Sequence, residues 1–293
     1  MKWILKRAAR TISKTRTRWK EELCIDYDEL TLRYATRSPT AKRWFYPRYI
    51  SGKRVHEPPI SSLIRSELLD GSTFYDVGAN VGFFTVLGAN LCTASDGEVH
   101  AFELDPALIP LIEESLRLNE NRGRAYLNCV ACTDEVGSFH RFQPEQRDNP
   151  STNRLKPDED IEEGEAYVQA STTTLDHYWR RTGAAPDLIK MDIEGAEALA
   201  VFGMLEVVEE VAPKLILEVH PEAVRQFGEQ PMSLVKQLRE VGRYETIARI
   251  ESYRSDQDEQ LRELTSLDTD LFEEDHPVVL FFASDLIDSD FCA

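Results

Sequence analysis

The sequence lacks any uninterrupted apolar run of the roughly 18 residues that a membrane-spanning helix needs. It has only five cysteines in 293 residues, an odd and scattered set that does not predict a disulfide framework. Cys129 and Cys132 form one C-x-x-C pair, which supplies half of a tetrahedral zinc site and no more. No secretory leader is recognisable. We therefore expect a soluble, cytoplasmic protein in a reducing environment.

Lysine is scarce in this chain. Ten of the 34 basic residues are lysines, and four of those ten follow residue 53. The 52 acidic residues give a formal net charge of −18, which argues against a nucleic-acid-binding protein. An acidic excess with arginine in place of lysine is typical of adaptation to high salt, and an ordinary acidic composition is the alternative.

The positive charge is concentrated at the start of the chain. Residues 1–55 carry 15 basic and 5 acidic residues, a net of +10, and residues 56–293 carry 19 and 47, a net of −28. Residues 1–20 combine eight basic residues with apolar ones at helical spacing, which predicts a basic amphipathic helix. This segment is interpreted as a solvated arm, as a segment docked on the acidic body, or as a peripheral contact with the inner face of an anionic membrane.

The rest of the chain alternates strand and helix patterns. We place a domain boundary near residue 60, so that residues 1–60 form the basic extension and residues 61–293 the main domain. Alternation predicts an α/β fold with a mostly parallel sheet, covered by helices on both faces, that binds ligands at the carboxyl ends of its strands. Residues 143–168 are expected to form an irregular insertion. The predicted strands are 73–77, 99–103, 126–130, 187–192, 213–219, 244–250 and 278–282.

The first predicted strand runs into a glycine-containing turn and a helix, which favours a nucleotide-type cofactor. Glu103 ends the next strand, where a carboxylate can accept hydrogen bonds from ribose hydroxyls. Both features fit NAD as well as S-adenosylmethionine. The turn Gly78-Ala79-Asn80-Val81-Gly82 is not G-x-G-x-x-G, however, and Asp76 just before it would repel a pyrophosphate but suit an ammonium group.

Four segments resemble, in order and spacing, the FkbM family of S-adenosylmethionine-dependent methyltransferases: residues 76–85, 101–106, 174–176 and 187–197. The likeness extends from about residue 73 to residue 283. It implies a Rossmann-like seven-stranded methyltransferase sheet, mostly parallel with an antiparallel last strand, and methyl transfer to an oxygen, usually a hydroxyl of a sugar or secondary metabolite. The chain departs from the family pattern in having Glu103-Leu104 where Glu-Pro is frequent, and in the insertion.

The resemblance also assigns roles to individual residues. The methionine end of the cofactor would be held by Asp76, Gly78, Asn80 and Gly82, the ribose by Glu103, and the adenine by Leu104 and Ala131. Methyl transfer then needs a group that accepts the proton of the attacking hydroxyl. His220 is the first candidate base, because an imidazole with a pKa near neutral suits this task.

Four acidic residues are expected at the same edge of the sheet as His220: Asp192, Glu194, Glu197 and Glu218. Asp192 and Glu218 close adjacent strands, a layout similar to that of metal-dependent catechol-type methyltransferases, in which a divalent ion binds the substrate oxygens. The interpretation favoured from the sequence is a metal-free site. In it, Lys190 pairs with one carboxylate and Glu197 faces solvent or caps the following helix.

The leading functional hypothesis is an O-methyltransferase that acts on a hydroxyl of a saccharide or related metabolite, and thus modifies a glycan or a small molecule. An NAD-dependent sugar oxidoreductase on the same fold is the first alternative, but the chain lacks its glycine fingerprint and a Tyr-x-x-x-Lys pair. The second alternative is a non-catalytic methyltransferase-like scaffold, which the intact cofactor loop disfavours.

Overall fold

The computed structural model describes residues 16–18, 22–37, 42, 45–50, 55–92, 96–120, 124–142, 155–156, 167–251, 261–264, 269–273 and 276–284. Eight strands form its central sheet, in the order β14-β13-β15-β12-β11-β4-β5-β6. Their bounds are β4 (Thr73–Val77), β5 (Glu98–Phe102), β6 (Ala125–Asn128), β11 (Leu188–Met191), β12 (Lys214–Val219), β13 (Thr246–Ile250), β14 (Leu261–Glu263) and β15 (Val278–Ala283).

The direction of these strands confirms the predicted sheet. β6, β5, β4, β11 and β12 pair in parallel, and β15 runs antiparallel between β12 and β13. The last strand along the chain is therefore antiparallel to its neighbours, as the resemblance implied. β14 pairs antiparallel with β13 and adds an eighth strand at the edge, in the acidic stretch where the sequence showed little pattern.

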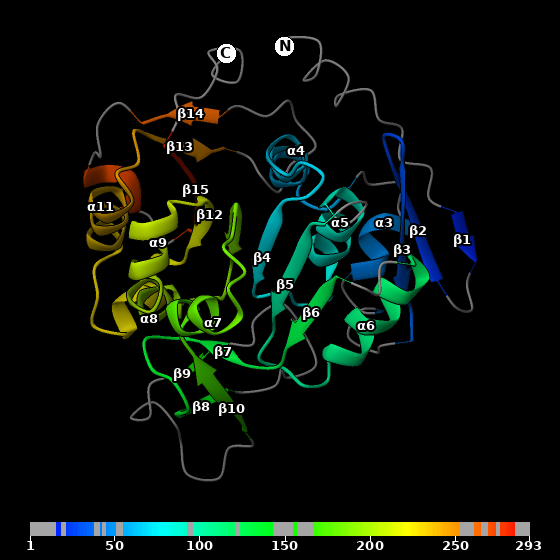
Figure 1. Cartoon of the computed structure of the whole chain (residues 1–293), viewed down its shortest axis with the longest axis horizontal. Helices are drawn as coiled ribbons and strands as arrows, with labels where there is room; N and C mark the ends of the chain where they lie inside the picture. The colour runs from blue at the N-terminus through cyan, green and yellow to red at the C-terminus, as the bar shows by residue number, and fades with distance from the viewer. Residues whose placement is uncertain are drawn as a thin grey trace.

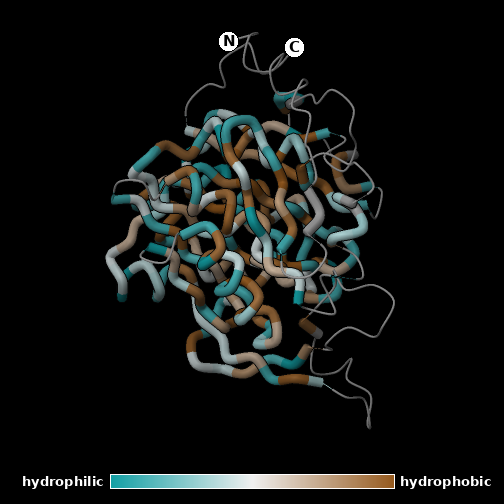
Figure 2. The backbone as a smooth tube through the Cα atoms, turned by 90° about the vertical axis from the view of Figure 1, so that its right-hand side faces the viewer, coloured by the Kyte–Doolittle hydropathy of each residue, from teal (hydrophilic) through white to brown (hydrophobic). Residues whose placement is uncertain are grey.

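Helices cover the two faces of this sheet (Figure 1). One face carries α4 (Pro58–Glu67), α5 (Phe83–Cys92) and α6 (Ile109–Leu118), and the other carries α7 (Leu175–Thr182), α8 (Glu197–Phe202), α9 (Leu205–Val211), α10 (Pro221–Gln226) and α11 (Pro231–Gly242). Side chains alternate along each strand, so that Phe74 packs on the first face and Tyr75 and Val77 pack on the second. Hydrophobic segments accordingly run through the interior of the molecule (Figure 2).

The described part of the N-terminal extension is a sheet. β1 (Arg16–Arg18), β2 (Glu22–Tyr27) and β3 (Leu30–Ala35) form an antiparallel meander, followed by α3 (Phe45–Ile50). The predicted helical extension is wrong for these residues, because burial in β2 alternates with the period of two that marks a strand. Residues 1–15, which hold most of the predicted amphipathic helix and membrane contact, lie outside the described residues.

The meander packs directly on the helices of the main domain. Tyr34 donates its hydroxyl hydrogen to the carbonyl of Phe83 at 3.2 Å, and the amide of Ala35 donates to Oγ of Ser115 at 3.0 Å. Residues on both sides of the predicted boundary near residue 60 share one hydrophobic cluster. The boundary stays a prediction, but the segments on its two sides have a common core.

A second, smaller sheet lies beyond the carboxyl ends of the central strands (Figure 1). It consists of β7 (Ala131–Cys132), β8 (Phe139–Phe142), β9 (Leu155–Lys156) and β10 (Val168–Thr173), in the order β7-β10-β8-β9. Leu104, Ile193 and Ala196, which follow β5 and β11, pack in its hydrophobic cluster. The small sheet therefore borders the edge at which ligands are expected. Apart from β9 and its last two residues, the predicted insertion 143–168 is outside the described residues.

Among the described residues, no helix is both long enough and apolar enough to cross a membrane.

Candidate active site

The turn after β4 requires glycine at residue 78. Gly78 has a φ of +82°, and a Cβ there would overlap the carbonyl oxygen of Asp192 at the end of β11. The amides of Gly78 and Ala79 donate to the carbonyl of Phe102, at 2.9 and 3.0 Å. Gly82 also has a positive φ, +80°, and lies against Ile112. The turn is thus held tightly between β5 and β11.

Two buried acceptor oxygens lie at this turn without a hydrogen-bond donor. Asp76 is fully buried; its Oδ2 accepts a hydrogen bond from Thr85 at 2.6 Å, whereas its Oδ1 has no hydrogen-bond partner. Asn80, with a φ of 52°, also has a buried Oδ1 without a partner. Burial raises the pKa of Asp76 and outweighs the opposing effects of Lys190 and Thr85. A ligand that brings hydrogen-bond donors would satisfy both oxygens.

Glu103 lies beside the same turn. Its Oε2 accepts a hydrogen bond from the amide of Asn80 at 2.7 Å, and its Oε1 accepts one from the amide of Asp105 at 2.8 Å. Burial raises the pKa of Glu103 to about 7, and these two hydrogen bonds oppose the shift. The two residues predicted to flank the adenine, Leu104 and Ala131, lie in one hydrophobic cluster of the small sheet.

The four predicted catalytic residues come together at the ends of β11 and β12. Asp192, Glu218 and His220 each place one side-chain atom within 4.8 Å of the others. Nε2 of His220 lies 3.4 Å from Oε2 of Glu194 and 3.7 Å from Oε1 of Glu218. Strand alternation brings Asp192 and Glu218 together, because even-numbered residues of β11 and β12 point to the α5 face of the sheet.

Glu197 is part of this cluster, as predicted, but the alternative in which it faces solvent or caps the helix is wrong. The side chain is completely buried rather than solvent-facing, and its Oε1 lies 2.8 Å from Nδ1 of His220. No local sequence signal indicates this burial, because Glu197 starts a helix, where an acidic side chain usually faces solvent. A buried Glu-His pair fixes the orientation of the imidazole ring.

The surroundings of His220 also change its expected titration. Burial opposes the charged ring, but the hydrogen bond to Glu197 and the charges of Glu197, Asp192 and Glu218 outweigh burial and raise the pKa of His220 to about 10. The expectation of a pKa near neutral is therefore wrong. The raised pKa favours an imidazolium in the metal-free protein, a form that does not accept a proton; the role of His220 as the base stays a prediction.

Lys190 connects the cofactor turn to the acidic cluster, which confirms that it pairs with a carboxylate. Its Nζ lies 3.6 Å from Oδ2 of Asp192 and 4.0 Å from Oδ1 of Asp76, and 5.1 Å from the centre of the Phe84 ring. Burial disfavours its charge, but Asp192 and Asp76 outweigh burial and raise the pKa of Lys190. Glu57, at the start of α4, contributes to the same shift, a role that no sequence motif indicated.

The family can now be assigned. A model of the FkbM methyltransferase domain matches residues 76–275, and this range contains the cofactor turn and the acidic cluster. The chain belongs to the FkbM methyltransferase family. Membership of this family and the observed sheet topology support an S-adenosylmethionine-dependent methyltransferase. They argue against the NAD-dependent oxidoreductase.

Solved structures give more distant matches. The methyltransferase FkbM of Methylobacillus flagellatus KT is 16% identical over 74% of this chain, with a TM-score of 0.45. This chain covers 44% of that protein, which is less than half of its length. A SAM-dependent O-methyltransferase of Thermotoga maritima is 12% identical, with a TM-score of 0.41. The match covers 90% of this chain and 78% of the Thermotoga protein. A SAM-dependent methyltransferase of Agrobacterium tumefaciens is 8% identical, with a TM-score of 0.47. The match covers 92% of this chain and 72% of the Agrobacterium protein. No curated protein matches the chain.

The residues of the turn fit S-adenosylmethionine. Oδ1 of Asp76 and Oδ1 of Asn80, which accept no hydrogen bond within the protein, are acceptors for an ammonium group. Glu103 beside them can accept hydrogen bonds from ribose hydroxyls. Each predicted cofactor residue lies along the turn or in the cluster next to it. When bound, this cofactor would supply an electrophilic methyl group to the acidic cluster.

Glu103 should make cofactor binding depend on pH. Because the ribose hydroxyls need a carboxylate acceptor and the pKa of Glu103 is about 7, affinity for S-adenosylmethionine should fall by roughly tenfold per pH unit below 7. The effect of this group on the free protein has the opposite sign. Between its unfolded pKa of 4.5 and its folded pKa of about 7, the folded state binds the extra proton, so the free energy of unfolding rises as pH falls.

Calorimetric titration at pH 6, 7 and 8 measures the first effect, and denaturation of the free protein at the same pH values measures the second. A Glu103→Gln variant is the control, with weak binding that does not vary with pH. Equal affinity of the unmodified protein at pH 6 and pH 8 would contradict the assignment of the ribose site.

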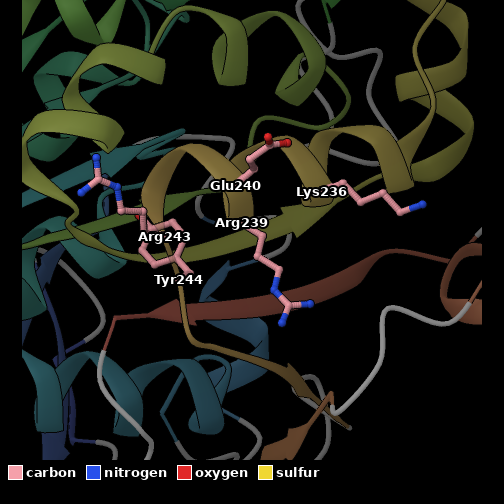
Figure 3. A pocket seen from close by; sticks show the side chains of 5 residues that line it. All are labelled: Lys236, Arg239, Glu240, Arg243 and Tyr244. Atoms are coloured by element: carbon pink, nitrogen blue, oxygen red, sulfur yellow. The ribbon is translucent and has the colours of Figure 1, made fainter.

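A cavity of about 550 Å³ lies elsewhere, along α11 and the residues that follow it (Figure 3). Its lining residues are Lys236, Arg239, Glu240, Arg243 and Tyr244. The cations cluster near the carboxyl end of α11, where the helix dipole favours positive charge. The predicted cofactor and catalytic residues do not line this cavity.

Proposed function

We propose that this FkbM methyltransferase methylates a hydroxyl oxygen of a saccharide or related metabolite. The observation that supports this is the acidic cluster beside the cofactor turn, in which Asp192, Glu194 and Glu218 surround His220. Carboxylates are acceptors only, so they bind ligands that donate hydrogen bonds, as sugar hydroxyls do. The same groups can take the proton that the reacting hydroxyl must lose.

Asp192 and Glu194 are the members of the cluster that an acceptor molecule can reach. Their side chains are 25% and 16% exposed, whereas those of Glu218 and Glu197 are 3% and 0% exposed. His220 already holds a proton at neutral pH. The hydroxyl proton therefore passes to Asp192 or Glu194 as the oxygen forms its bond to the methyl carbon.

The small sheet supports a sugar-like acceptor. Phe139 on β8 is 65% exposed, and Tyr167, next to β10, is 42% exposed. The guanidinium of Arg141 lies 4.7 Å from the centre of the Tyr167 ring. Exposed aromatic rings of this kind offer apolar faces to ring-shaped ligands, and this sheet borders the edge that carries the acidic cluster.

The test uses S-adenosylmethionine with a ¹³C-labelled methyl group, the full chain and a panel of glycans and hydroxylated metabolites. NMR of the product should find the label on oxygen. Glu194→Gln should lower kcat by about 100-fold, the usual loss on removing a general base, and should leave the affinity for S-adenosylmethionine unchanged. Glu222→Gln, an exposed acid on α10, is the matched control.

A label found on nitrogen or carbon would contradict O-methylation. Full activity of Glu194→Gln would move the proton acceptor to Asp192. Tight binding of S-adenosylmethionine with no transfer to any acceptor would favour the scaffold alternative.

A further inference from the structure

We propose that Asp192, Glu218 and His220 bind one divalent first-row metal ion at the ends of β11 and β12. The role of the ion in catalysis rests on the proposed function, whereas its binding does not. This proposal replaces the metal-free interpretation that the sequence favoured. The sequence placed two carboxylates on adjacent strands but could not show a nitrogen ligand between them.

The geometry of the three side chains fits a single ion. One atom from each lies within 4.8 Å of the other two, a separation that an ion with bonds of about 2.0 to 2.3 Å can bridge. Glu218 and His220 are buried, and Asp192 is partly exposed. The ion would thus be anchored on its inner side and open toward the region that an acceptor molecule can enter.

The orientation of His220 is an independent indication. His220 is 4% exposed. Its buried Nε2 makes no hydrogen bond, although this atom faces the carboxylates of Glu194 and Glu218. The other ring nitrogen, Nδ1, is hydrogen-bonded to the fully buried Glu197. A histidine that binds a metal through one nitrogen almost always donates its other N–H to such a partner. The ion would displace the proton that Nε2 carries in the metal-free protein.

The chemistry of the cluster points the same way. Among the described residues, the carboxylates of Asp76, Asp192, Glu194, Glu197 and Glu218 lie beside Lys190 and His220. A group of carboxylates on adjoining strand ends provides the oxygen ligands that a divalent cation takes.

The ligand set indicates which metals are suitable. Calcium takes oxygen ligands, whereas a mixed set of one imidazole and two carboxylates suits manganese and its first-row neighbours. Such an ion would hold the acceptor hydroxyl and lower its pKa. Glu194 is not one of the three ligands, and its carboxylate could take the hydroxyl proton.

The probe for this site is Mn²⁺. The full chain is stripped with a chelator and titrated with Mn²⁺ at pH 7, with EPR reporting the free ion, in KCl of about 0.5 M to screen the acidic surface. We expect one strongly bound ion per chain. Asp192→Asn and Glu218→Gln should weaken binding by more than tenfold, and Glu197→Gln, which alters only the support of His220, by about 10- to 100-fold. Glu222→Gln is exposed and close in sequence, and should bind Mn²⁺ as the unmodified chain does.

S-adenosylmethionine affinity, measured on every variant without metal, verifies that the variant is folded. If Asp192→Asn is unfolded, Glu218→Gln and Glu197→Gln still decide the question. Undiminished Mn²⁺ binding in those variants, or no strong binding in the unmodified chain, would overturn the site.

Methyl transfer assays separate this proposal from the proposed function. Bound Mn²⁺ without transfer to any hydroxyl would contradict the function and support the site. Transfer that persists in chelated protein would support the function and overturn the catalytic role of the ion, and a titration with no strongly bound Mn²⁺ would overturn the site itself. Loss of transfer on chelation, reversed by Mn²⁺, would support both.

Discussion

Replacement of Gly78 with alanine is expected to abolish measurable S-adenosylmethionine binding and to lower the free energy of unfolding by about 2 to 5 kcal/mol. Two effects add at this residue. A side chain at a φ of +82° is strained by about 1 to 2 kcal/mol, and the added Cβ would overlap the carbonyl oxygen of Asp192. The overlap can be relieved only by separating the cofactor turn from β11, which would displace the acceptors of Asp76 and Asn80.

Gly228 provides a matched control for this substitution. Its φ is +80°, and nothing lies within 4 Å of the position that a Cβ would occupy. Gly228→Ala should therefore cost only the backbone strain of about 1 to 2 kcal/mol and leave cofactor binding intact. Urea denaturation and calorimetric titration measure both quantities. If the two variants lose equal stability and bind the cofactor equally well, the close approach of the turn to β11 has no functional importance.

The central sheet, apart from β14, could be predicted because each of its other strands carries a local signal. β4, β11 and β12 are continuous buried runs bounded by polar residues, and parallel topology then brings their carboxyl ends to one edge. That rule is enough to group Asp192, Glu218 and His220 at one edge from the sequence alone. It depends only on the order of the strands and on the alternation of side chains.

The contacts around His220 could not be predicted in the same way. The pairing of His220 with Glu197 joins a strand end to a helix 23 residues away, and a glutamate at a helix start usually faces solvent. Its burial follows from a tertiary contact, because Gly195, just before α8, lies against Ala223 of α10. The shift of the pKa of His220 away from neutral has the same origin, because it needs several carboxylates from separate segments.

The N-terminal meander was missed for a different reason. The helix prediction rests on the basic residues and the helical spacing of the apolar residues in 1–20. β2 and β3, which follow this segment, carry an alternating pattern of their own. Arg33 and Thr31 are exposed while Leu32 and Tyr34 are buried. A period of two over such a short hairpin is a weak signal, and the packing of Tyr34 against α5 decides the outcome.

Replacement of Lys190 with methionine is expected to lower the free energy of unfolding by about 3 to 5 kcal/mol, the usual loss when one partner of a buried ion pair is removed. Methionine keeps most of the apolar length of the side chain, so packing against Phe84 is largely retained. What is lost is the cation between Asp76 and Asp192. A second substitution, Asp76→Asn, should restore part of the stability, because it removes one of the uncompensated carboxylates.

Lys214 on the neighbouring strand separates this effect from the general loss of a lysine. Its ammonium is paired with Glu67, but its side chain is 36% exposed, so Lys214→Met should cost at most about 1 kcal/mol. Urea denaturation of the two single variants and of the Lys190→Met, Asp76→Asn double variant completes the comparison. Similar losses for the two lysines, or no recovery in the double variant, would show that Lys190 does not compensate the buried carboxylates. The acidic edge would then have to be stabilised by another cation, and the Mn²⁺ titration would report whether the metal site supplies it.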